Sequence, residues 1–267
     1  MIANYHTHTY RCGHATPDGE RVYVEQAIKA GLRIMGFADH SPMPVPRGVD
    51  VADCPKFWDV RMSLEETEDY VNTLLALREE YKNEISIPIG FEVEYFPEVF
   101  EDYISFISQY PIDYIILGQH FESVKDTFWF GKEDRPEQAL IKYVDLTCEA
   151  IKTGKFTYIA HPDLCNFSGR AEVYEREMTR LINCANSYKL PLEINFCGMQ
   201  NERHYPYAPF WQLASEIGCD VVFGIDAHDP AHVINPPVLE RAQTLVSEHQ
   251  GLNLLETVKL ISPINKI

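Results

Sequence analysis

Long apolar runs are missing from this chain of 267 residues. No stretch approaches the roughly 18 consecutive apolar residues that a membrane-spanning helix needs. Residues 1–6, Met-Ile-Ala-Asn-Tyr-His, also lack the basic and then apolar plan of a secretory signal. We therefore expect a cytoplasmic location and no membrane partner.

Positive charge is scarce as well. The chain has 23 lysines and arginines against 40 aspartates and glutamates, which gives a net charge of −17 at pH 7. Because proteins that bind nucleic acid neutralise phosphates with basic side chains, we expect no nucleic-acid partner. The glycine-rich patterns GxGxxG and GxxxxGKS/T, which cradle nucleotide phosphates, are absent too. Any phosphate site in this chain must obtain its positive charge from another source.

Paired cysteine motifs are also lacking. The cysteines are odd in number, scattered, and never spaced as CxxC, which is typical of reduced and mostly buried thiols. Hydrophobic residues make up 45% of the chain, and neither a linker nor a low-complexity tract interrupts it. We therefore predict a single domain over residues 1–267. The cysteines are Cys12, Cys54, Cys148, Cys165, Cys184, Cys197 and Cys219.

Short apolar segments alternate with longer amphipathic segments along the chain. Strands that alternate with helices form parallel sheets, and seven such units in this length favour a closed or nearly closed α/β barrel over an open sheet. The predicted strands are Ile2–His8, Arg33–Asp39, Ile85–Glu92, Asp113–Gly118, Thr157–Ala160, Leu192–Asn195 and Asp220–Ile225.

Two segments between the strands have a distinct character. Ser63 and Glu66 have the spacing of a capping box, which predicts a helix that runs toward Asn83. The segment Ser41–Ser63 contains four prolines and no clear periodicity. It predicts a long loop over one face of the molecule.

Side chains that bind metal ions recur where the predicted strands end. The carboxyl ends of parallel strands open onto one face of a barrel, so these residues converge although they are distant in sequence. A single histidine at a strand end is more often an ordinary hydrogen-bonded residue. Seven of the ten histidines lie at or just after these ends, however, and together with acidic residues they indicate a metal cluster. The strand-end residues are His6, His8, Asp39, His40, Glu92, His120, His161, Glu193, Asn195, Asp226 and His228.

The spacing within each motif suits metal binding. In His6-Thr-His8 the two imidazoles point to the same side of a strand and can chelate one ion, and Asp226-Ala-His228 repeats that spacing with a carboxylate. Glu92 and Glu94 have the same two-residue spacing. A carboxylate can also bridge two cations about 3.5–4 Å apart. His14 follows a few residues after the first motif and can reach a further ion.

With these motifs, the chain resembles the polymerase and histidinol phosphatase (PHP) superfamily and, within it, the monofunctional histidinol-phosphatases. The motifs run from the first residues to about position 228 and are specific as a set. They are His6-Thr-His8, His14, Phe37-Ala-Asp-His40-Ser-Pro42, Gly90-Phe-Glu92-Val-Glu94-Tyr95, Leu117-Gly-Gln-His120-Phe, Ala160-His161-Pro-Asp-Leu164, Leu192-Glu-Ile-Asn195 and Gly224-Ile-Asp226-Ala-His228.

The resemblance implies a distorted (βα)7 TIM-like barrel with its active site at the carboxyl ends of the strands. It also implies hydrolysis of L-histidinol phosphate to L-histidinol and phosphate in histidine biosynthesis. Three divalent ions, of Zn, Mn or Fe, would supply the positive charge that the chain lacks. The implied ligand sets are His6, His8, Glu92 and Asp226 for one ion, Glu92, His120 and His161 for a second, and His14, His40 and His228 for a third.

Our mechanistic hypothesis is that a hydroxide between the first two ions attacks phosphorus in line. Asp39 is the candidate proton donor to the leaving group, or alternatively a residue that orients a histidine. Arg203 and Arg170 are candidates to hold the phosphate, with surface salt bridges as the alternative. The candidate partners of the substrate's ammonium and imidazole groups are Glu94, Glu122 and Glu193.

Three other interpretations remain open. An amidohydrolase-like barrel also carries an HxH motif and a late aspartate, but no lysine ends a middle strand here to form a carbamate bridge. The same phosphoesterase chemistry on a nucleotide or another small phosphate ester is a second alternative. A metal-binding or regulatory module is a third, against which the intact ligand positions argue. His204 is a further candidate substrate contact, and we expect His232 in the loop after the last strand and His249 at a surface helix end.

Overall fold

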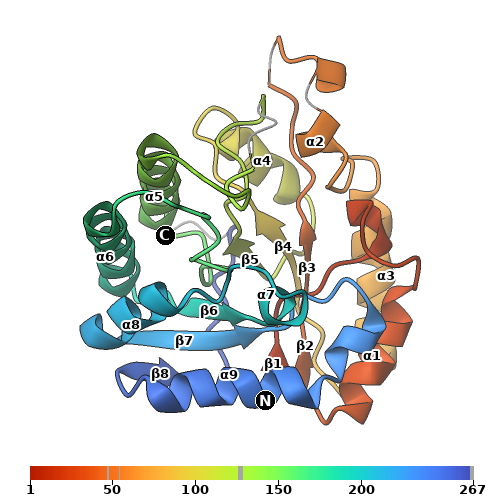
Figure 1. Cartoon of the computed structure of the whole chain (residues 1–267). Coiled ribbons are helices and arrows are strands. Elements are labelled where there is room, and N and C mark those ends of the chain that lie inside the picture. The colour runs from red at the N-terminus through yellow and green to blue at the C-terminus, as the bar shows by residue number, and fades with distance from the viewer. Residues whose placement is uncertain (47, 54, 126–128, 265–267) are drawn as a thin grey trace.

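The computed structural model of the chain describes residues 1–46, 48–53, 55–125 and 129–264. Short strands lie in the middle of the molecule, and helices surround them (Figure 1). The strands are β1 (Ala3–Asn4), β2 (Ile34–Met35), β3 (Phe37–His40), β4 (Ile89–Val93), β5 (Tyr114–Leu117), β6 (Leu192–Asn195), β7 (Cys219–Gly224) and β8 (Leu252–Leu254). The helices are α1 (Glu20–Lys29), α2 (Pro55–Trp58), α3 (Thr67–Glu80), α4 (Phe100–Ile107), α5 (Glu137–Lys152), α6 (Ala171–Ser187), α7 (Phe196–Gln200), α8 (Ala208–Ile217) and α9 (Pro236–Glu248), with short 3-10 helices at Tyr10–Cys12, Val51–Asp53 and Pro230–Val233.

All of the strand pairs are parallel, as the alternation of strands and helices predicts. β1 pairs with β2, β3 to β5 form a second sheet, and β6 to β8 form a third. Isolated bridges at Ile159 join Leu117 to Leu192, and a bridge between Thr7 and Ala227 joins the first segment to the one after β7. Within the described ranges the strands therefore form three sheets linked by single bridges, which confirms a parallel α/β fold but not a continuous closed sheet.

Several strands differ from their prediction. Only Ala3–Asn4 of the predicted strand Ile2–His8 forms a strand, β1. The segment Arg33–Asp39 is divided into β2 and β3 at Gly36, where a Cβ atom would lie 2.5 Å from Tyr114 Oη. That hydroxyl donates a hydrogen bond to Tyr5 O (2.6 Å), so the close approach joins three segments. The segment Thr157–Ala160 pairs only through the bridges of Ile159, and β8 was not predicted.

Side chains on the two faces of the strands enter different apolar layers. In β6, Leu192 and Ile194 belong to the large outer core between strands and helices, while Glu193 points to the opposite side. A smaller inner core fills the space between the strands themselves. This inner core consists of Ala3, Tyr5, Ala38, Tyr114, Ile116, Tyr158, Ala160 and Val222.

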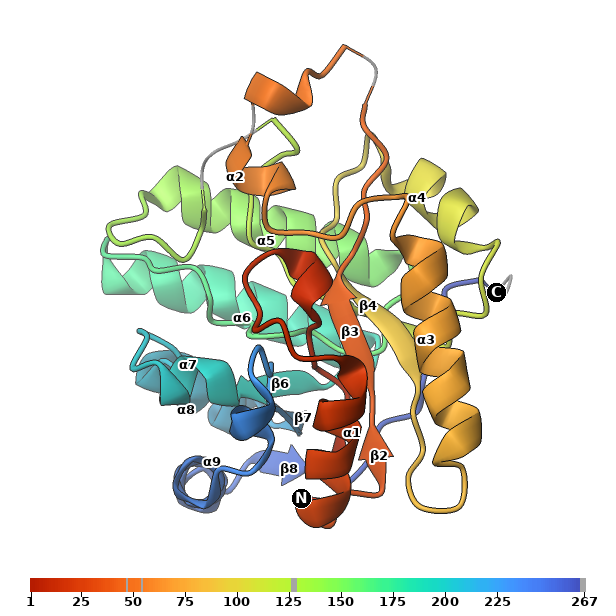
Figure 2. The same cartoon turned by 90° about the vertical axis from the view of Figure 1, so that its right-hand side faces the viewer.

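Helices cover the strands from two sides. Figure 1 shows α5 and α6 on one side and α1 and α3 on the other, and Figure 2 shows the segment of α2 projecting beyond α1 and α3. Ser63 Oγ and Ser63 N both donate to Glu66 Oε2 (2.8 and 2.9 Å), but α3 begins only at Thr67 and its N-cap, Glu66, makes no side-chain cap hydrogen bond, so the predicted capping box is wrong. The helix ends at Glu80 rather than near Asn83. The predicted loop Ser41–Ser63 is wrong in part, since it contains two short helices.

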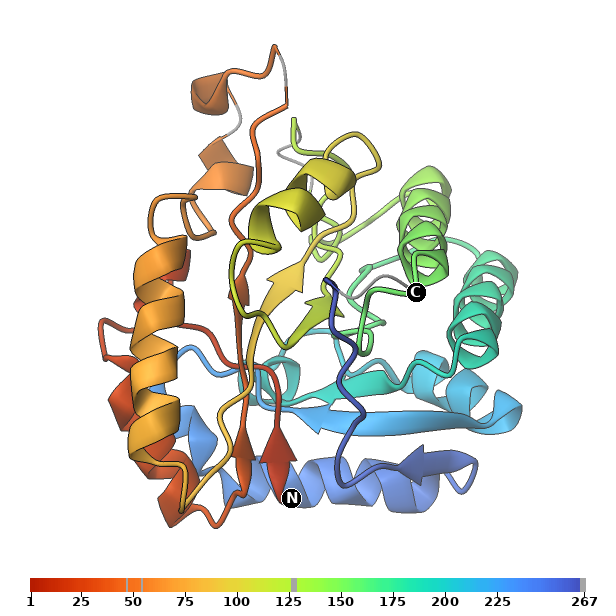
Figure 3. The same ribbon diagram turned by 180° about the vertical axis from the view of Figure 1, so that it is seen from behind.

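The C-terminal segment after β8 runs across the back of the strands (Figure 3). Ile261 N donates to Thr157 Oγ1 (3.0 Å), and Val258 and Leu260 pack against the inner core. The apolar layer between the strands is therefore covered at this end by the last part of the chain. No helix among the described residues is both long and apolar enough to cross a membrane.

The cysteines of the described ranges are free thiols, as expected from their spacing. Cys12, Cys148, Cys165, Cys197 and Cys219 are buried, and Cys184 is half-buried. Cys54 lies outside the described residues.

Candidate metal centre and active site

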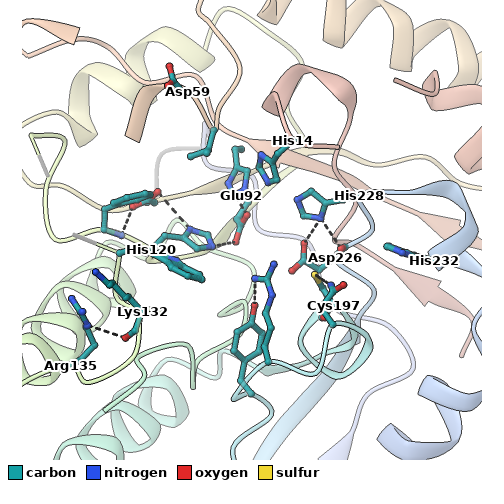
Figure 4. A pocket seen from close by; sticks show the side chains of 18 residues that line it. His14, Asp59, Glu92, His120, Lys132, Arg135, Cys197, Asp226, His228 and His232 are labelled. Carbon is teal, nitrogen blue, oxygen red and sulfur yellow. Dashed lines mark hydrogen bonds and ion pairs between the residues drawn. The ribbon is translucent and has the colours of Figure 1, made fainter. Parts of the chain in front are cut away.

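A cavity of about 920 Å³ opens at the carboxyl ends of the strands. Glu92, at the end of β4, lies among histidines that come from other strands and loops (Figure 4). The predicted metal ligands that line the cavity are His14, His40, Glu92, His120, Asp226 and His228, and the remaining ones, His6, His8 and His161, lie within 3.6 Å of Glu92 in the layer beneath.

Glu92 is the centre of the cluster. Its Oε1 atom lies 2.8 Å from His161 Nε2 and 3.6 Å from His120 Nε2, and its Oε2 atom lies 3.1 Å from His40 Nδ1. Gly118 makes room for this carboxylate, because a Cβ atom there would lie 1.9 Å from Glu92 Oε1. Both oxygens of one buried carboxylate thus face imidazoles on different elements.

The first strand and the last predicted strand meet beside Glu92. His8 Nε2 lies 3.1 Å from His6 Nε2 and 3.0 Å from Asp226 Oδ1. The segments that carry them pair directly, because His8 N donates to Ala227 O (2.9 Å). The motifs His6-Thr-His8 and Asp226-Ala-His228 therefore face each other. His6, His8 and Asp226 have ligand atoms close enough to share one ion.

A third group lies nearer the mouth of the cavity. The ring centroid of His14 is 4.6 Å from that of His228 and 5.3 Å from that of His40. Their nitrogens also lie close enough to share an ion. Gly13 lets the chain turn toward this group, since its φ of 77° suits glycine and a Cβ atom would lie 2.7 Å from Asp59 O.

Unsatisfied polar atoms concentrate in this cluster. Buried polar atoms are normally hydrogen-bonded, so each exception calls for a partner. Five buried atoms on predicted ligands have no hydrogen-bond partner among the described residues. They are Glu92 Oε2, Asp226 Oδ1, His120 Nδ1, His161 Nδ1 and His228 Nε2. This donor set of imidazoles and carboxylates fits divalent ions such as Zn²⁺, Mn²⁺ or Fe²⁺.

The electrostatics of the cluster favour a cation. Burial opposes a charge on His6, yet the carboxylates of Glu193, Asp226 and Glu92 raise its pKa to about 10. Burial lowers the pKa of His40 and of His228 well below the usual range. The carboxylates therefore attract positive charge, while the two outer histidines stay neutral and keep a lone pair for an ion.

Two of these residues have left-handed backbone conformations. His161 has a φ of 28° and Asp226 a φ of 52°. Such conformations cost on the order of 1–3 kcal/mol in residues other than glycine and concentrate at functional sites. The fold thus holds both side chains in place against local strain.

Buried carboxylates behind the cluster hold the first strand's imidazoles. Glu193 Oε1 lies 2.8 Å from His6 Nδ1, and its Oε2 accepts from His161 N (3.1 Å). Asp39 Oδ1 lies 3.3 Å from His8 Nδ1 and accepts from His40 N (2.8 Å). A carboxylate on the far nitrogen of an imidazole fixes the ring and directs its other nitrogen toward an ion.

Some of the other predicted site residues line the cavity and some lie outside its lining. Arg203 and Glu94 line the cavity. Arg170 instead projects from the surface, with 72% of its side chain exposed, and pairs with Glu137 (2.8 Å). Four more lie outside the cavity lining, namely Asp39, Glu122, Glu193 and His204, whereas His232 lines it.

Sequence reasoning missed several residues of the cavity wall. Lys132 and Arg135 lie in the segment between β5 and α5, and Tyr205 and Trp129 are aromatic wall residues. The rule that active-site residues come from loops after parallel strands could have found the two basic ones. Arg61, which holds Glu94, had no signal in the sequence because its partner is distant along the chain.

Comparisons with known proteins identify the family and several relatives of the chain. The PHP domain family model matches residues 4–196. The chain is 28% identical over 239 residues to a probable histidinol-phosphatase of Deinococcus radiodurans, covering 87% of this chain and 88% of that protein. It is 35% identical over 119 residues to the histidinol-phosphatase of Bacillus subtilis, covering 43% of this chain and 42% of that protein.

Solved structures show the same fold. The histidinol phosphate phosphatase of Lactococcus lactis, crystallised with zinc, L-histidinol and phosphate, has a TM-score of 0.72 at 20% identity and covers 98% of both chains. A putative histidinol phosphatase of Listeria monocytogenes has a TM-score of 0.71 at 22% identity and covers 89% of this chain and 99% of its own.

Proposed function

Because the chain belongs to the PHP domain family, we propose that it is a histidinol-phosphatase, which hydrolyses L-histidinol phosphate to L-histidinol and phosphate. The observation that carries this proposal is the convergence of imidazoles and carboxylates from six segments of the chain, that of Glu92 included, with buried atoms left unsatisfied. The curated relatives with the same activity in their names support the choice of substrate. Histidine biosynthesis is the process that this reaction serves.

We assign three divalent ions to the cluster, with Glu92 shared between two of them. When bound, such ions polarise the phosphate and lower the pKa of water to provide a nucleophile near neutral pH. The ligand sets we propose are His6, His8, Glu92 and Asp226, then Glu92, His120 and His161, and then His14, His40 and His228.

Arg203 is our candidate for holding the phosphate. Its Nη1 donates to Tyr205 Oη (2.9 Å), which orients the guanidinium at the cavity wall. The other N–H groups of the planar fork suit a tetrahedral oxyanion. We do not extend this role to Arg170, because its ion pair with Glu137 lies outside the cavity lining.

We propose that Asp39 is a positioning residue rather than a proton donor. Its carboxylate is fully buried and accepts hydrogen bonds from Thr9 N (3.1 Å) and His40 N, while it faces His8 Nδ1. A group held in this way keeps the His8 ring in place and has no path to a leaving group in the cavity.

We propose that the strands form a distorted seven-unit TIM-like barrel and that residues 1–267 make one domain. Hydrogen bonds between neighbouring segments support the closure, since Ala38 N donates to Thr7 O (2.9 Å) and Ala227 N donates to His6 O (3.4 Å). In such a barrel the carboxyl ends of all strands share one face, which accounts for the clustering of the ligands.

A phosphate-release assay tests the function. The protein, loaded with Mn²⁺ or Zn²⁺, is incubated with L-histidinol phosphate, other amino-alcohol and sugar phosphates, and nucleotides. We expect L-histidinol phosphate to have the highest kcat/KM and a chelator to abolish turnover. A higher kcat/KM for a nucleotide or another ester would assign a different substrate to the same centre, and ions bound without turnover on any ester would favour a metal-binding module.

A further inference from the structure

Arg61 is a buried arginine next to Asp59 and Val60, which line the cavity. Only 2% of its side chain is exposed. Its Nε donates to Phe57 O (2.6 Å) and its Nη1 to Ser41 O (3.4 Å), and the guanidinium stacks on the Phe57 ring at 3.5 Å. The side chain therefore joins the beginning and the end of the segment 41–63.

The remaining arm of Arg61 reaches Glu94. Arg61 Nη2 donates to Glu94 Oε1 (2.9 Å), and Glu94 Oε2 accepts from Phe121 N (3.0 Å). Only 3% of the Glu94 side chain is exposed. Both oxygens of this carboxylate are thus held in place from two sides.

A buried ion pair of this kind is costly to build. Removing two charges from water carries a penalty that their mutual attraction often fails to recover, so such a pair is weak evidence for a stabilising role. Arg11–Glu20 is buried to a similar degree, with 2% and 5% of the side chains exposed, whereas about half of each side chain is exposed in Arg21–Glu80. The Arg61–Glu94 pair differs from both because Glu94 also lines the cavity, and this position calls for a role at the site.

His120 lies directly beside this pair. Its Nδ1 is buried without a hydrogen-bond partner among the described residues and is 3.7 Å from Glu94 Oε1. Its other nitrogen, Nε2, is 3.6 Å from Glu92 Oε1. The ring thus has one nitrogen toward the proposed ions and the other toward a fixed carboxylate.

We propose that Arg61 is a positioning residue that holds Glu94 against His120 Nδ1 and so fixes the His120 ring for metal binding. This inference rests on the proposed metal-dependent function. A carboxylate on the far nitrogen of a metal-binding histidine selects the tautomer and orients the ring. Glu94 is then part of the support of the metal centre and not a partner of the substrate's ammonium group.

Metal binding by four variants tests this role without a substrate. Arg61→Met removes the clamp, Arg61→Lys keeps its charge, Glu94→Gln keeps an oxygen toward Arg61 but loses the carboxylate, and Arg78→Met is the matched control. Arg78 also hydrogen-bonds a backbone carbonyl, Ile87 O (2.8 Å), and pairs with Asp113, but near the amino ends of β4 and β5. Circular dichroism selects folded variants, and elemental analysis across a chelator titration counts the ions retained.

We expect Arg61→Met and Glu94→Gln to bind one ion about 10- to 100-fold more weakly, the usual effect of removing the support of a metal ligand. Arg61→Lys should fall between them and the wild type, and Arg78→Met should match the wild type. Wild-type metal binding by folded Arg61→Met would overturn the proposal. If that variant does not fold, wild-type binding by Glu94→Gln would overturn it instead, as would equal weakening in Arg78→Met. A wild-type protein that binds its ions but releases no phosphate would refute only the proposed function.

Discussion

The two ends of the space between the strands have opposite characters. Toward the amino ends, the inner core contains apolar and tyrosine side chains, and the single hydroxyl hydrogen of Tyr114 lies between Tyr5 O (2.6 Å from Oη) and Phe37 O (3.1 Å). Toward the carboxyl ends, Glu92 Oε2 and Asp226 Oδ1 are buried without hydrogen-bond partners among the described residues. The same strands thus support a satisfied core at one end and an unsatisfied, cation-attracting site at the other.

Backbone conformation follows the same division. His161 and Asp226 have positive φ at the carboxyl ends, where candidate ligands are needed. The inner core has no residue with a positive φ among its members. Two of the five non-glycine residues with a positive φ among the described residues are therefore candidate ligands, at positions where bound ions would offset the strain.

The largest effect should come from Glu92→Ala, which removes the carboxylate shared by several imidazoles. We expect turnover to fall by about 10²- to 10³-fold, as when a principal electrostatic group is lost, together with a lower metal content. Steady-state kinetics and elemental analysis check the two outcomes. Full activity in this variant would exclude the bridging role of Glu92.

Gly118→Ala should act on the same carboxylate from behind. The added Cβ atom would lie 1.9 Å from Glu92 Oε1, so the carboxylate has to move away from its imidazoles. We expect metal affinity to fall about 10- to 100-fold, the range seen when the support of metal ligands is disturbed. Gly19→Ala is the matched control, because nothing lies within 4 Å of a Cβ atom there. Equal metal affinity in both variants would contradict this account.

Tyr114→Phe tests the amino end and should change stability without changing chemistry. Loss of the hydroxyl leaves two buried carbonyl groups short of a donor. We expect the free energy of unfolding to fall by about 1–3 kcal/mol, the cost of a buried unsatisfied polar group. Urea denaturation measures this change, and kcat/KM of the folded variant should equal that of the wild type. A large loss of kcat/KM with unchanged stability would reverse the division between the two ends.

His204→Gln should have the smallest effect, on pH dependence outside the metal cluster. Burial lowers the pKa of His204, and its Nε2 donates to Leu164 O (2.7 Å). The ordinary pKa of a histidine is about 6.5. When the pH falls below this value, the unfolded chain binds more protons than the folded one, so the free energy of unfolding decreases as the pH decreases. The amide of glutamine keeps a donor but cannot titrate, so the variant should lose less stability than the wild type between pH 7.5 and 5. If the free energy of unfolding had the same pH dependence in the variant and in the wild type, this prediction would be wrong.

Local signals predicted much of the molecule. Ser63 and Glu66 predicted a helix that begins in this region, and α3 begins at Thr67, while the spacing of His6 and His8 predicted two imidazoles side by side. These features depend on a few neighbouring residues, so the sequence carries them directly. The segment Arg33–Asp39 was less predictable, because its break at Gly36 depends on Tyr114, which is distant along the chain.

The sequence predicted which residues lie near the cluster more readily than it predicted what each of them contacts. Asp39 and Glu193 both follow the strand-end pattern, but they are buried behind His8 and His6 rather than exposed in the cavity. Arg170 and Arg203 both follow predicted strands, yet only Arg203 lines the cavity. The position of a residue in the sequence indicates that it lies at or after a strand end, but it does not indicate the direction in which its side chain points.

The order of residues along the chain determined the parallel α/β architecture, the types of side chain at the strand ends, and the chemistry those types can perform, because strand periodicity and ligand preference are local properties. Tertiary structure decided which of those side chains lie close enough to share an ion, which stand behind them, and that Arg61 and Glu94 meet. These contacts join segments separated by loops and helices, and their geometry exists only after the strands have packed around the inner core.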